Sequence, residues 1–225
     1  MSNLNGIFTD EMDALAQQVL TSLVVVQQQP GRGLRRFFAG AGAGIIWEED
    51  GLVLTNNHVI GRGSVTVILN DGRSFPAKTI AREADIDLAL LEIPAGGLRP
   101  LRPAADKPRI GALVFAFGHP FGRRNTVTRG IVSAFAKART RGGREIPILR
   151  TDVALAPGNS GGPMVNVLGE LVGINAMIMG GDQSISIPVS VAREFTARVL
   201  ESRHSARSPQ GEPVEGPPGR PTGVI

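Results

Sequence analysis

The residues best suited to chemistry lie in a glycine-rich segment, Gly158-Asn159-Ser160-Gly161-Gly162-Pro163. A serine hydroxyl is an effective nucleophile when it is exposed and when backbone N–H groups point at the negative charge that develops on the substrate oxygen. Neighbouring glycines permit the tight concave turn that this geometry needs, because they have no Cβ to clash. The segment therefore predicts Ser160 as a nucleophile, with the N–H groups of Gly158 and Ser160 as oxyanion donors. An ordinary turn is the alternative.

A nucleophilic serine needs a general base, and the chain offers only three histidines. His58 follows the apolar stretch 52–55, at a point where a strand would meet a loop. His119 lies in a Gly-Pro-rich segment typical of a structural turn, and His204 lies in a tail without an apolar pattern. A histidine placed like His58 is more often structural when taken alone, but the serine segment favours it as the base.

The base needs a carboxylate that fixes its tautomer and stabilises its charged form. Asp87 enters the apolar stretch 88–93, where a carboxylate without a partner would be costly to bury. Asp85 is the alternative, but at that place a carboxylate would more readily be solvated. The order His58, Asp87, Ser160 is the chymotrypsin-like order, and it differs from the subtilisin and α/β-hydrolase orders.

Short strands separated by turns dominate the elements that must position these residues. Asp50-Gly51 and Asn70-Asp71-Gly72 lie between apolar runs and indicate tight turns. This pattern predicts an all-β fold of sandwich or barrel type. The predicted strands cover residues 23–26, 44–47, 52–55, 65–69, 75–80, 88–93, 113–117, 126–135, 164–168, 171–174 and 185–187.

A proline-marked stretch, 94–108, divides the strands into two groups and predicts a link between two lobes. His58 and Asp87 fall in the first group and Ser160 in the second, so a catalytic cleft between two β-barrels is expected. Apolar residues at helical spacing predict a helix at each end of these two lobes, and a high Pro and Gly content predicts a disordered tail. The predicted division of the chain follows. It consists of an N-terminal segment at 1–21 with a helix at 9–20, a first barrel at 22–105, a second barrel at 106–203 ending in a helix at 190–200, and a disordered tail at 204–225.

Composition excludes several classes of protein. The 225 residues carry 24 Lys and Arg against 20 Asp and Glu, and 42% are hydrophobic, as in a soluble globular protein. The absence of Cys excludes disulfides, thiolate zinc sites and cysteine nucleophiles. No apolar run reaches the ~18 residues of a membrane span, and acids precede the first basic residue, unlike in a secretory signal. We therefore expect a cytoplasmic protein without membrane association, metal or cofactor.

Five segments, in this order, resemble the HtrA/Deg family of trypsin-like serine proteases. They are 55–60 (TNNHVI), 87–91 (DLALL), 118–122 (GHPFG), 126–133 (TVTRGIVS) and 151–163 (TDVALAPGNSGGP). The resemblance covers roughly residues 15–200.

The resemblance implies two six-stranded chymotrypsin-like barrels with an N-terminal and a C-terminal helix. It also implies ATP-independent endoproteolysis of unfolded or damaged proteins, and a homotrimer. In these terms His58 is the general base, Asp87 its orienting acid and Ser160 the nucleophile, with the Gly158 and Ser160 N–H groups as the oxyanion hole. HtrA relatives usually carry PDZ domains, but only 25 residues remain from Glu201 onward, fewer than the ~40 that usually fold alone. We therefore expect a protease domain only.

Substrate selection is predicted from the residues around the serine. Ala154 stands six residues before Ser160, where digestive relatives carry an acid that selects Lys or Arg. With Leu155, Ala176 and Ile178 as further walls, the pocket should be apolar and should accept small or medium aliphatic residues such as Val or Ala.

Control of activity is predicted from Asn159, which stands where digestive relatives carry an Asp that binds a freshly cut N-terminus. An Asn cannot form that ion pair. We expect no zymogen cleavage, and control through ordering of the segments 154–158 and 176–184.

Other interpretations rest on two further features. Apolar Ile7 and Phe8 near the N-terminus would suit a trimer contact, or they are chance residues in a frayed end. The segment 123–150 holds eight basic residues and one acid, a net +7, which leaves −3 for the rest. It could bind nucleic acid, but the only interleaved aromatic is Phe135, so a nucleic-acid partner is not expected. A catalytically inactive, protease-shaped binding protein is the alternative function.

Overall fold

The computed structural model describes residues 3–28, 41–61, 63–140, 142–178 and 184–207, without the side chains of 3–8, 177–178 and 206–207. Within these residues the chain forms two α-helices, α1 (Asn3–Leu20) and α2 (Val189–Arg207), and two short 3₁₀ turns, η2 (Asn57–Val59) and η3 (Pro120–Gly122). The strands of the first half are β1 (Leu23–Gln28), β2 (Ala41–Glu48), β3 (Leu52–Asn56), β4 (Val65–Ile68), β5 (Ser74–Glu83) and β6 (Leu88–Glu92). Those of the second half are β7 (Leu113–Gly118), β8 (Thr126–Arg139), β9 (Glu145–Thr151), β10 (Pro163–Val165), β11 (Leu171–Ile178) and β12 (Ser184–Pro188).

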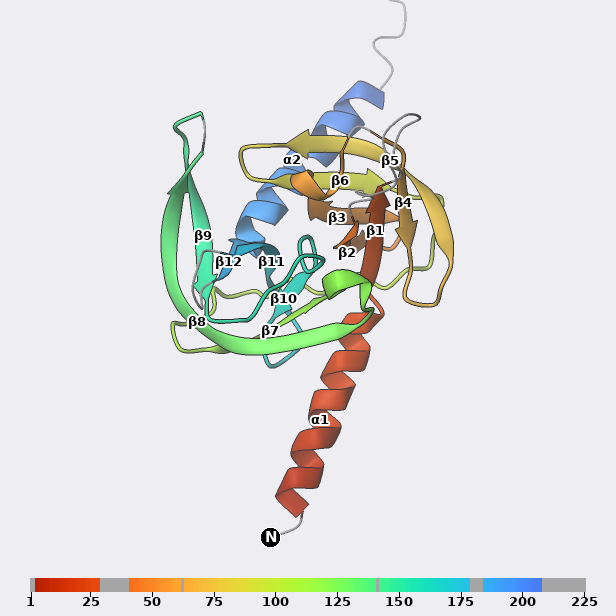
Figure 1. The fold of residues 1–225 in the computed structure, drawn as a ribbon. Coiled ribbons are helices and arrows are strands. Elements are labelled where there is room, and N and C mark those ends of the chain that lie inside the picture. Colours follow the sequence, from red (N-terminus) through yellow and green to blue (C-terminus); the bar gives the residue numbers. More distant parts are fainter. Residues whose placement is uncertain (1–2, 29–40, 62, 141, 179–183, 208–225) are drawn as a thin grey trace, which may run out of the picture.

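Each half closes into an antiparallel barrel, so the predicted fold class is confirmed (Figure 1). The first barrel has the strand order β1-β2-β3-β6-β5-β4, and the second has the order β10-β11-β12-β9-β8-β7. The segment between β6 and β7 joins the two barrels along the predicted proline-marked stretch. α1 projects away from the body, and α2 lies against both barrels (Figure 1).

Turn chemistry fixes the register of the strand that leads to His58. β2 and β3 pair across the turn that ends at Gly51, with Ile45 opposite Leu54 and Ile46 opposite Val53. Gly51 has a φ of 102°, and a Cβ there would overlap the carbonyl oxygen of Ile93, so only glycine fits this turn. All of β3 is buried, and the chain therefore leaves the barrel at a defined point directly before His58.

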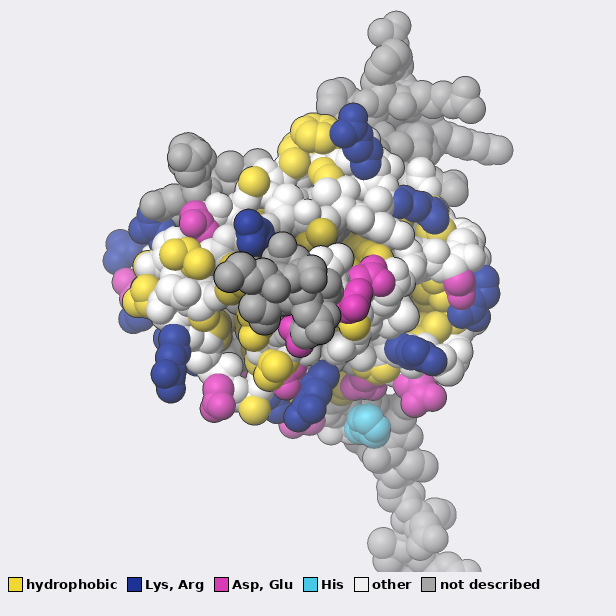
Figure 2. Space-filling view, turned by 90° about the horizontal axis from the view of Figure 1, so that it is seen from below, with side chains coloured by type: hydrophobic (Ala, Val, Ile, Leu, Met, Phe, Trp, Pro, Cys, Tyr) yellow, Lys and Arg dark blue, Asp and Glu magenta, His cyan; other side chains and the backbone are white. Residues whose placement is uncertain are grey.

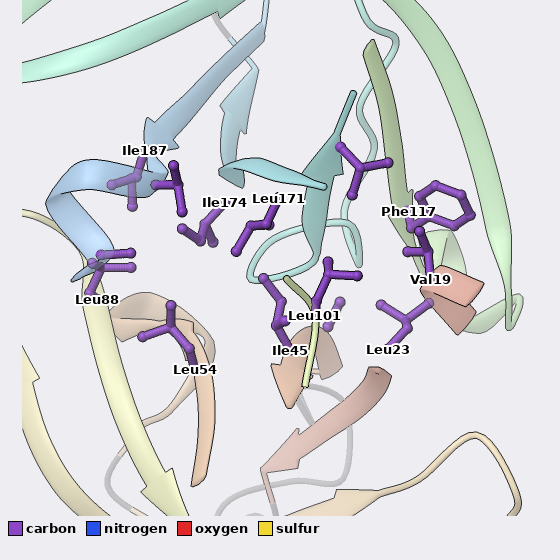
Figure 3. Close-up of a cluster of buried hydrophobic side chains, with 14 of the residues drawn as sticks. Val19, Leu23, Ile45, Leu54, Leu88, Leu101, Phe117, Leu171, Ile174 and Ile187 are labelled. Carbon is purple, nitrogen blue, oxygen red and sulfur yellow. The ribbon is translucent and has the colours of Figure 1, made fainter. Parts of the chain in front are cut away.

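The largest buried cluster lies between the barrels (Figure 3). Ile45, Leu54 and Leu88 from the first barrel are members of the same cluster as Ile174 and Ile187 from the second. Side chains from both helices complete it, including Leu15, Val19, Val191, Ala192 and Phe195. Because this burial is shared, the hydrophobic effect that stabilises the fold also sets how the two barrels lie against each other.

Several element boundaries differ from the prediction. α1 begins six residues earlier than the sequence predicts, and α2 extends through residues 204–207, which the sequence predicts as part of a disordered tail. Residues 208–225 lie outside the described part of the chain. β9 was missed, because Pro147 and the flanking charges hide its pattern, although its inner residues Ile148 and Leu149 are buried.

Candidate active site

His58 and Asp87 meet through two contacts at one edge of the first barrel. The Nδ1 atom of His58 lies 2.7 Å from Oδ2 of Asp87, and the backbone N–H of His58 donates to Oδ1 at 2.9 Å. One carboxylate oxygen thus orients the ring and the other fixes the backbone that carries it. This arrangement assigns the proton on the ring to Nδ1, which leaves Nε2 able to accept a proton. The His58 side chain is 50% exposed, so the ring is accessible to a substrate.

Asp87 is held in a conformation that few residues adopt. Its φ is 55°, in the left-handed region, which is uncommon for any residue except glycine. Its carbonyl accepts hydrogen bonds from Nδ2 of Asn56 at 2.9 Å and from the N–H of Asn57 at 3.1 Å. The residues before His58 therefore hold the backbone of Asp87 while its carboxylate holds His58, and the alternative Asp85 takes no part in this contact.

The serine segment leaves the two predicted oxyanion donors unpaired. Between them, the N–H of Asn159 donates to the carbonyl of Ala156 at 2.9 Å. The N–H groups of Gly158 and Ser160 have no hydrogen-bond acceptor among the described residues. Gly158 has a φ of 107°, which glycine adopts without strain. Two unpaired N–H groups, one on each side of the paired N–H of Asn159, suit the binding of a developing oxyanion.

Ser160 is joined to the first barrel through its backbone. Its carbonyl accepts a hydrogen bond from the N–H of Ala43 in β2 at 2.8 Å. A Cβ at the neighbouring Gly42 would overlap the side chain of Val59 and press on the Ser160 carbonyl oxygen, so this close approach needs glycine. The nucleophile candidate on the second barrel is therefore positioned by the barrel that carries His58.

The hydroxyl of Ser160 does not contact His58 in this structure. Oγ donates to the carbonyl of Ala176 in β11 at 3.2 Å, and among the described residues no hydrogen bond joins it to the His58 ring. Catalytic hydrogen bonds are often long in unliganded sites and tighten when substrate binds. The structure thus brings His58 and Asp87 into contact, while the Ser160 hydroxyl is bonded to the Ala176 carbonyl.

A buried asparagine that the sequence analysis missed supports the serine segment. Asn175 is fully buried, and its Nδ2 donates to the carbonyls of Phe117 at 3.0 Å and Pro163 at 3.2 Å. Its backbone exchanges hydrogen bonds with Gly161 at 2.8 Å and Gly162 at 2.9 Å. Buried polar side chains are costly without partners, so a single Asn inside an otherwise apolar strand was the signal that could have found it.

His119 packs against the serine segment as a buried, neutral group. It is 5% exposed, its N–H donates to the Gly158 carbonyl at 3.1 Å, and its Nδ1 accepts from the N–H of Asn125 at 3.3 Å. Burial lowers the pKa of His119 to about 4; the carbonyl of Val24 opposes this shift, and the charge of Arg124 adds to it. Its environment fits the structural turn predicted from the sequence.

We expect His119 to make stability depend on pH. Because the unfolded chain protonates this side chain below about pH 6.5 and the folded chain only near pH 4, stability falls as pH is lowered through this window. The full loss is about 3 kcal/mol, taken from the pKa difference. Urea unfolding of wild type and His119→Asn at pH 7 and pH 4.5 measures it. Equal pH dependence in both proteins would contradict this expectation.

The predicted pocket residues occupy different settings. Ala154 is exposed, and its carbonyl accepts a hydrogen bond from Oγ1 of Thr128 at 2.9 Å. Leu155 packs partly buried against the core of the second barrel, and Ala176 packs against the core between the barrels. The side chain of Ile178, at the end of β11, lies outside the described part of the chain, as do residues 179–183.

The basic segment 123–150 forms mainly the hairpin of β8 and β9, and part of its charge is paired. Lys137 contacts Glu145 at 3.0 Å, and Arg144 contacts Glu83 at 3.1 Å. Phe135 is only partly exposed, and the ammonium of Lys107 lies 3.5 Å from its ring centre. A base could stack on that ring only by displacing Lys107, which offers no support for nucleic-acid binding.

No metal or membrane-spanning feature is found in the described part of the chain. It contains no group of three or more His, Asp or Glu side chains able to hold a metal ion. Neither of its helices combines the length and the hydropathy that crossing a bilayer requires.

Comparisons with known proteins agree with this architecture. The family model for the trypsin-like peptidase domain matches residues 42–174. A protein of Haemophilus influenzae named "Probable periplasmic serine protease do/HhoA-like" is 41% identical over 78% of this chain and 40% of its own length. The "Periplasmic serine endoprotease DegP" of Escherichia coli is 38% identical over 76% of this chain and 38% of its own length. The crystal structure of the serine endoprotease from Yersinia pestis matches with a TM-score of 0.74 at 30% identity, over 85% of this chain and 67% of that one.

Two facts from these comparisons bear on the predictions. The chain spans about two fifths of the length of the curated relatives. The predicted cytoplasmic location is wrong, because relatives at about 40% identity are named periplasmic. The prediction rested on the absence of a visible signal peptide or membrane span, and an absence of this kind does not fix where a protein is located.

Proposed function

Because the chain belongs to the trypsin-like peptidase family, and within it to the HtrA/Deg proteases, we propose that it is a serine endopeptidase. His58 is the general base, Asp87 the acid that orients it, and Ser160 the nucleophile. The observation that carries the proposal is the double contact of Asp87 with the ring and the backbone of His58. The unpaired N–H groups of Gly158 and Ser160 support it.

The reaction follows from these positions. On substrate binding the Ser160 hydroxyl leaves the Ala176 carbonyl and attacks the scissile carbonyl carbon, while Nε2 of His58 accepts its proton. The carbonyl oxygen becomes an oxyanion held by the Gly158 and Ser160 N–H groups. Collapse breaks the C–N bond, and His58 returns the proton to the leaving amine. A water molecule, deprotonated by His58, then hydrolyses the acyl-enzyme and restores Ser160.

Covalent labelling tests this function. A serine-directed fluorophosphonate should label the wild-type chain at Ser160, and Ser160→Ala should take up no label. Labelling of both proteins at another residue would contradict the assignment. A wild-type chain that resists labelling while still binding unfolded protein would instead be the inactive, protease-shaped binding protein.

We propose that the substrates are unfolded or damaged proteins, cut without ATP after small or medium aliphatic residues. The half-exposed His58 ring suits an extended segment of an unfolded chain. Ala154, Leu155 and Ala176 place no charge near the expected pocket, so a Lys or Arg side chain would enter it without a counter-ion.

A peptide panel measures this specificity. Peptides that differ only in the residue before the cleaved bond should give kcat/KM values about 100-fold higher for Val or Ala than for Arg or Lys, since burying an unpaired charge costs several kcal/mol. A preference for Arg or Lys would overturn the pocket assignment.

We further propose a homotrimer as the assembly. Phe121 is 77% exposed in η3, and Val127 and Ile131 are 46% and 41% exposed on the outer face of β8. β8 runs along the lower side of the molecule in Figure 1, and Figure 2, seen from below, shows hydrophobic side chains among Lys and Arg on that face. Exposed apolar groups of this size suit contact with a second copy. The side chains of Ile7 and Phe8 lie outside the described residues. Sedimentation velocity distinguishes a trimer from a monomer.

We propose a periplasmic location, on the names of the relatives. Fractionation of cells that produce the protein tests it.

A further inference from the structure

We propose that Arg82 is a positioning residue for His58. Its guanidinium holds the turn that carries the histidine, and so sets where the ring lies relative to Asp87 and Ser160. This role rests on the proposed function, and it assigns to Arg82 a part in catalysis without contact with the substrate.

The guanidinium reaches three backbone carbonyls and one side chain of a single turn. Nε donates to Oδ1 of Asn57 at 2.7 Å, and Nη2 donates to the carbonyls of Asn57 at 3.1 Å and Ile60 at 2.7 Å. Nη1 donates to the carbonyl of Gly61 at 3.1 Å. These acceptors lie on both sides of His58, so one rigid group spans the whole turn.

The turn depends on such a partner. η2 has only three residues, so the carbonyls at its end have no intrahelical donor and need another. Val59 and Ile60 anchor the turn from below in the core of the first barrel, where they are 7% and 1% exposed. Above the core, His58 itself is exposed. Arg82 bonds this turn at four acceptors, and Oε1 of Gln28 adds one further bond, from the Gly61 N–H at 3.1 Å.

Arg82 is itself rigidly placed relative to Asp87. It belongs to β5, where it pairs with Ala89 of β6, and the chain turns from β5 into β6 through Asp87. The hydrogen bonds of Arg82 and of Asp87 therefore hold His58 from two points of one hairpin. Without the Arg82 side chain, the turn that carries His58 could shift relative to the Asp87 carboxylate.

The chemistry requires arginine at this place. Its planar fork presents five N–H donors in fixed directions, whereas a lysine ammonium is a single compact centre on a flexible chain. Within the described residues the guanidinium forms no ion pair, so its donors serve the turn alone. A lysine would keep the charge but could not reach acceptors on Asn57, Ile60 and Gly61 together.

The test compares Arg82→Ala and Arg82→Lys with Arg73→Ala, a control in the same barrel whose side chain contacts Asp71 and the ring of Phe75, two residues away on either side. We expect Arg82→Ala to lower kcat for a peptide about 10- to 100-fold, because shifts near 1 Å cost up to ~100-fold, with KM changed less than about 2-fold. Arg82→Lys should recover only part of the loss, and Arg73→Ala should match wild type. Methylguanidine at non-denaturing concentration should partly restore Arg82→Ala and leave the control unchanged.

A second measurement does not depend on activity. In a Ser160→Ala background, the Nδ1 proton of His58 shared with Asp87 should give a far-downfield NMR signal, which Arg82→Ala should broaden or remove while Arg73→Ala retains it. Unchanged kcat in Arg82→Ala, an unchanged signal, or a loss without rescue that follows a lowered Tm would each overturn the role. If wild type proves inactive, the proposed function fails, and the NMR signal alone still decides whether Arg82 positions His58.

Discussion

Ser160→Ala should lower kcat for cleavage of an unfolded casein-like substrate by roughly 10⁴- to 10⁶-fold, the range found when a serine protease loses one residue of its triad. The reason is that the proposed mechanism forms the acyl-enzyme on the Ser160 hydroxyl, which alanine lacks. The measurement is the rate of peptide-bond cleavage at saturating substrate, with equal amounts of both proteins.

The matched control for this loss is Ser202→Ala. Ser202 is an exposed helix residue whose hydroxyl donates only to the carbonyl of Arg198, four residues earlier. It should keep wild-type activity. Ser160→Ala should also keep its stability within about 1 kcal/mol, because its hydroxyl makes one hydrogen bond and its carbonyl keeps the bond to Ala43. Cleavage by Ser160→Ala at more than about one hundredth of the wild-type rate would assign the chemistry to another residue.

Asp87→Asn should lower kcat by about 10⁴-fold, as expected when the orienting acid of a triad becomes an amide. Both carboxylate oxygens of Asp87 accept hydrogen bonds from His58, at 2.7 and 2.9 Å. An amide has one oxygen and one NH₂ group. Its oxygen can accept from one of these two N–H donors, and its NH₂ group then faces the other donor and cannot accept from it. If the amide oxygen accepts the backbone N–H, the ring must present its unprotonated nitrogen to the NH₂ group, and Nε2 can then no longer accept the serine proton.

Asparagine is the right probe because it tolerates the left-handed backbone that Asp87 adopts. Loss of activity in Asp87→Asn therefore does not arise from backbone strain, as it would with Val. Asp85→Asn is the control, since among the described residues no hydrogen bond or ion pair joins Asp85 to His58. A larger loss in Asp85→Asn than in Asp87→Asn would reverse the choice between the two acids.

Short-range signals in the sequence predicted much of the fold. They also selected His58, Asp87 and the 158–163 segment as the candidate site, because a strand end, an acid that is costly to bury and clustered glycines can each be read from neighbouring residues. The structure places His58 and Asp87 in contact, and the catalytic roles remain a prediction. β9 was missed, because Pro147 interrupts its pattern and its pairing with β8 is a long-range property. The long extent of α2 was missed as well. Its last turns are polar, and Arg203 is paired with Glu92 in the first barrel at 2.8 Å.

The residues that hold the candidate site in place were harder to predict from the sequence than the residues assigned to the chemistry. Asn175 and Arg82 act through backbone carbonyls that are distant in sequence, at Phe117 and Pro163 for the first and across the His58 turn for the second. No spacing rule connects a side chain with a carbonyl on another strand. Such contacts could be found only after the barrels were placed.

The bond between the Ala43 N–H and the Ser160 carbonyl has a consequence for the synthesis of the protein. The proposed base and its acid, His58 and Asp87, lie on the half of the chain that leaves the ribosome first, and the proposed nucleophile, Ser160, lies on the half that leaves last. α2, which is made after both, packs into the cluster between the barrels. A partly synthesised chain therefore lacks part of the proposed site, and we expect activity only after the second barrel has folded against the first.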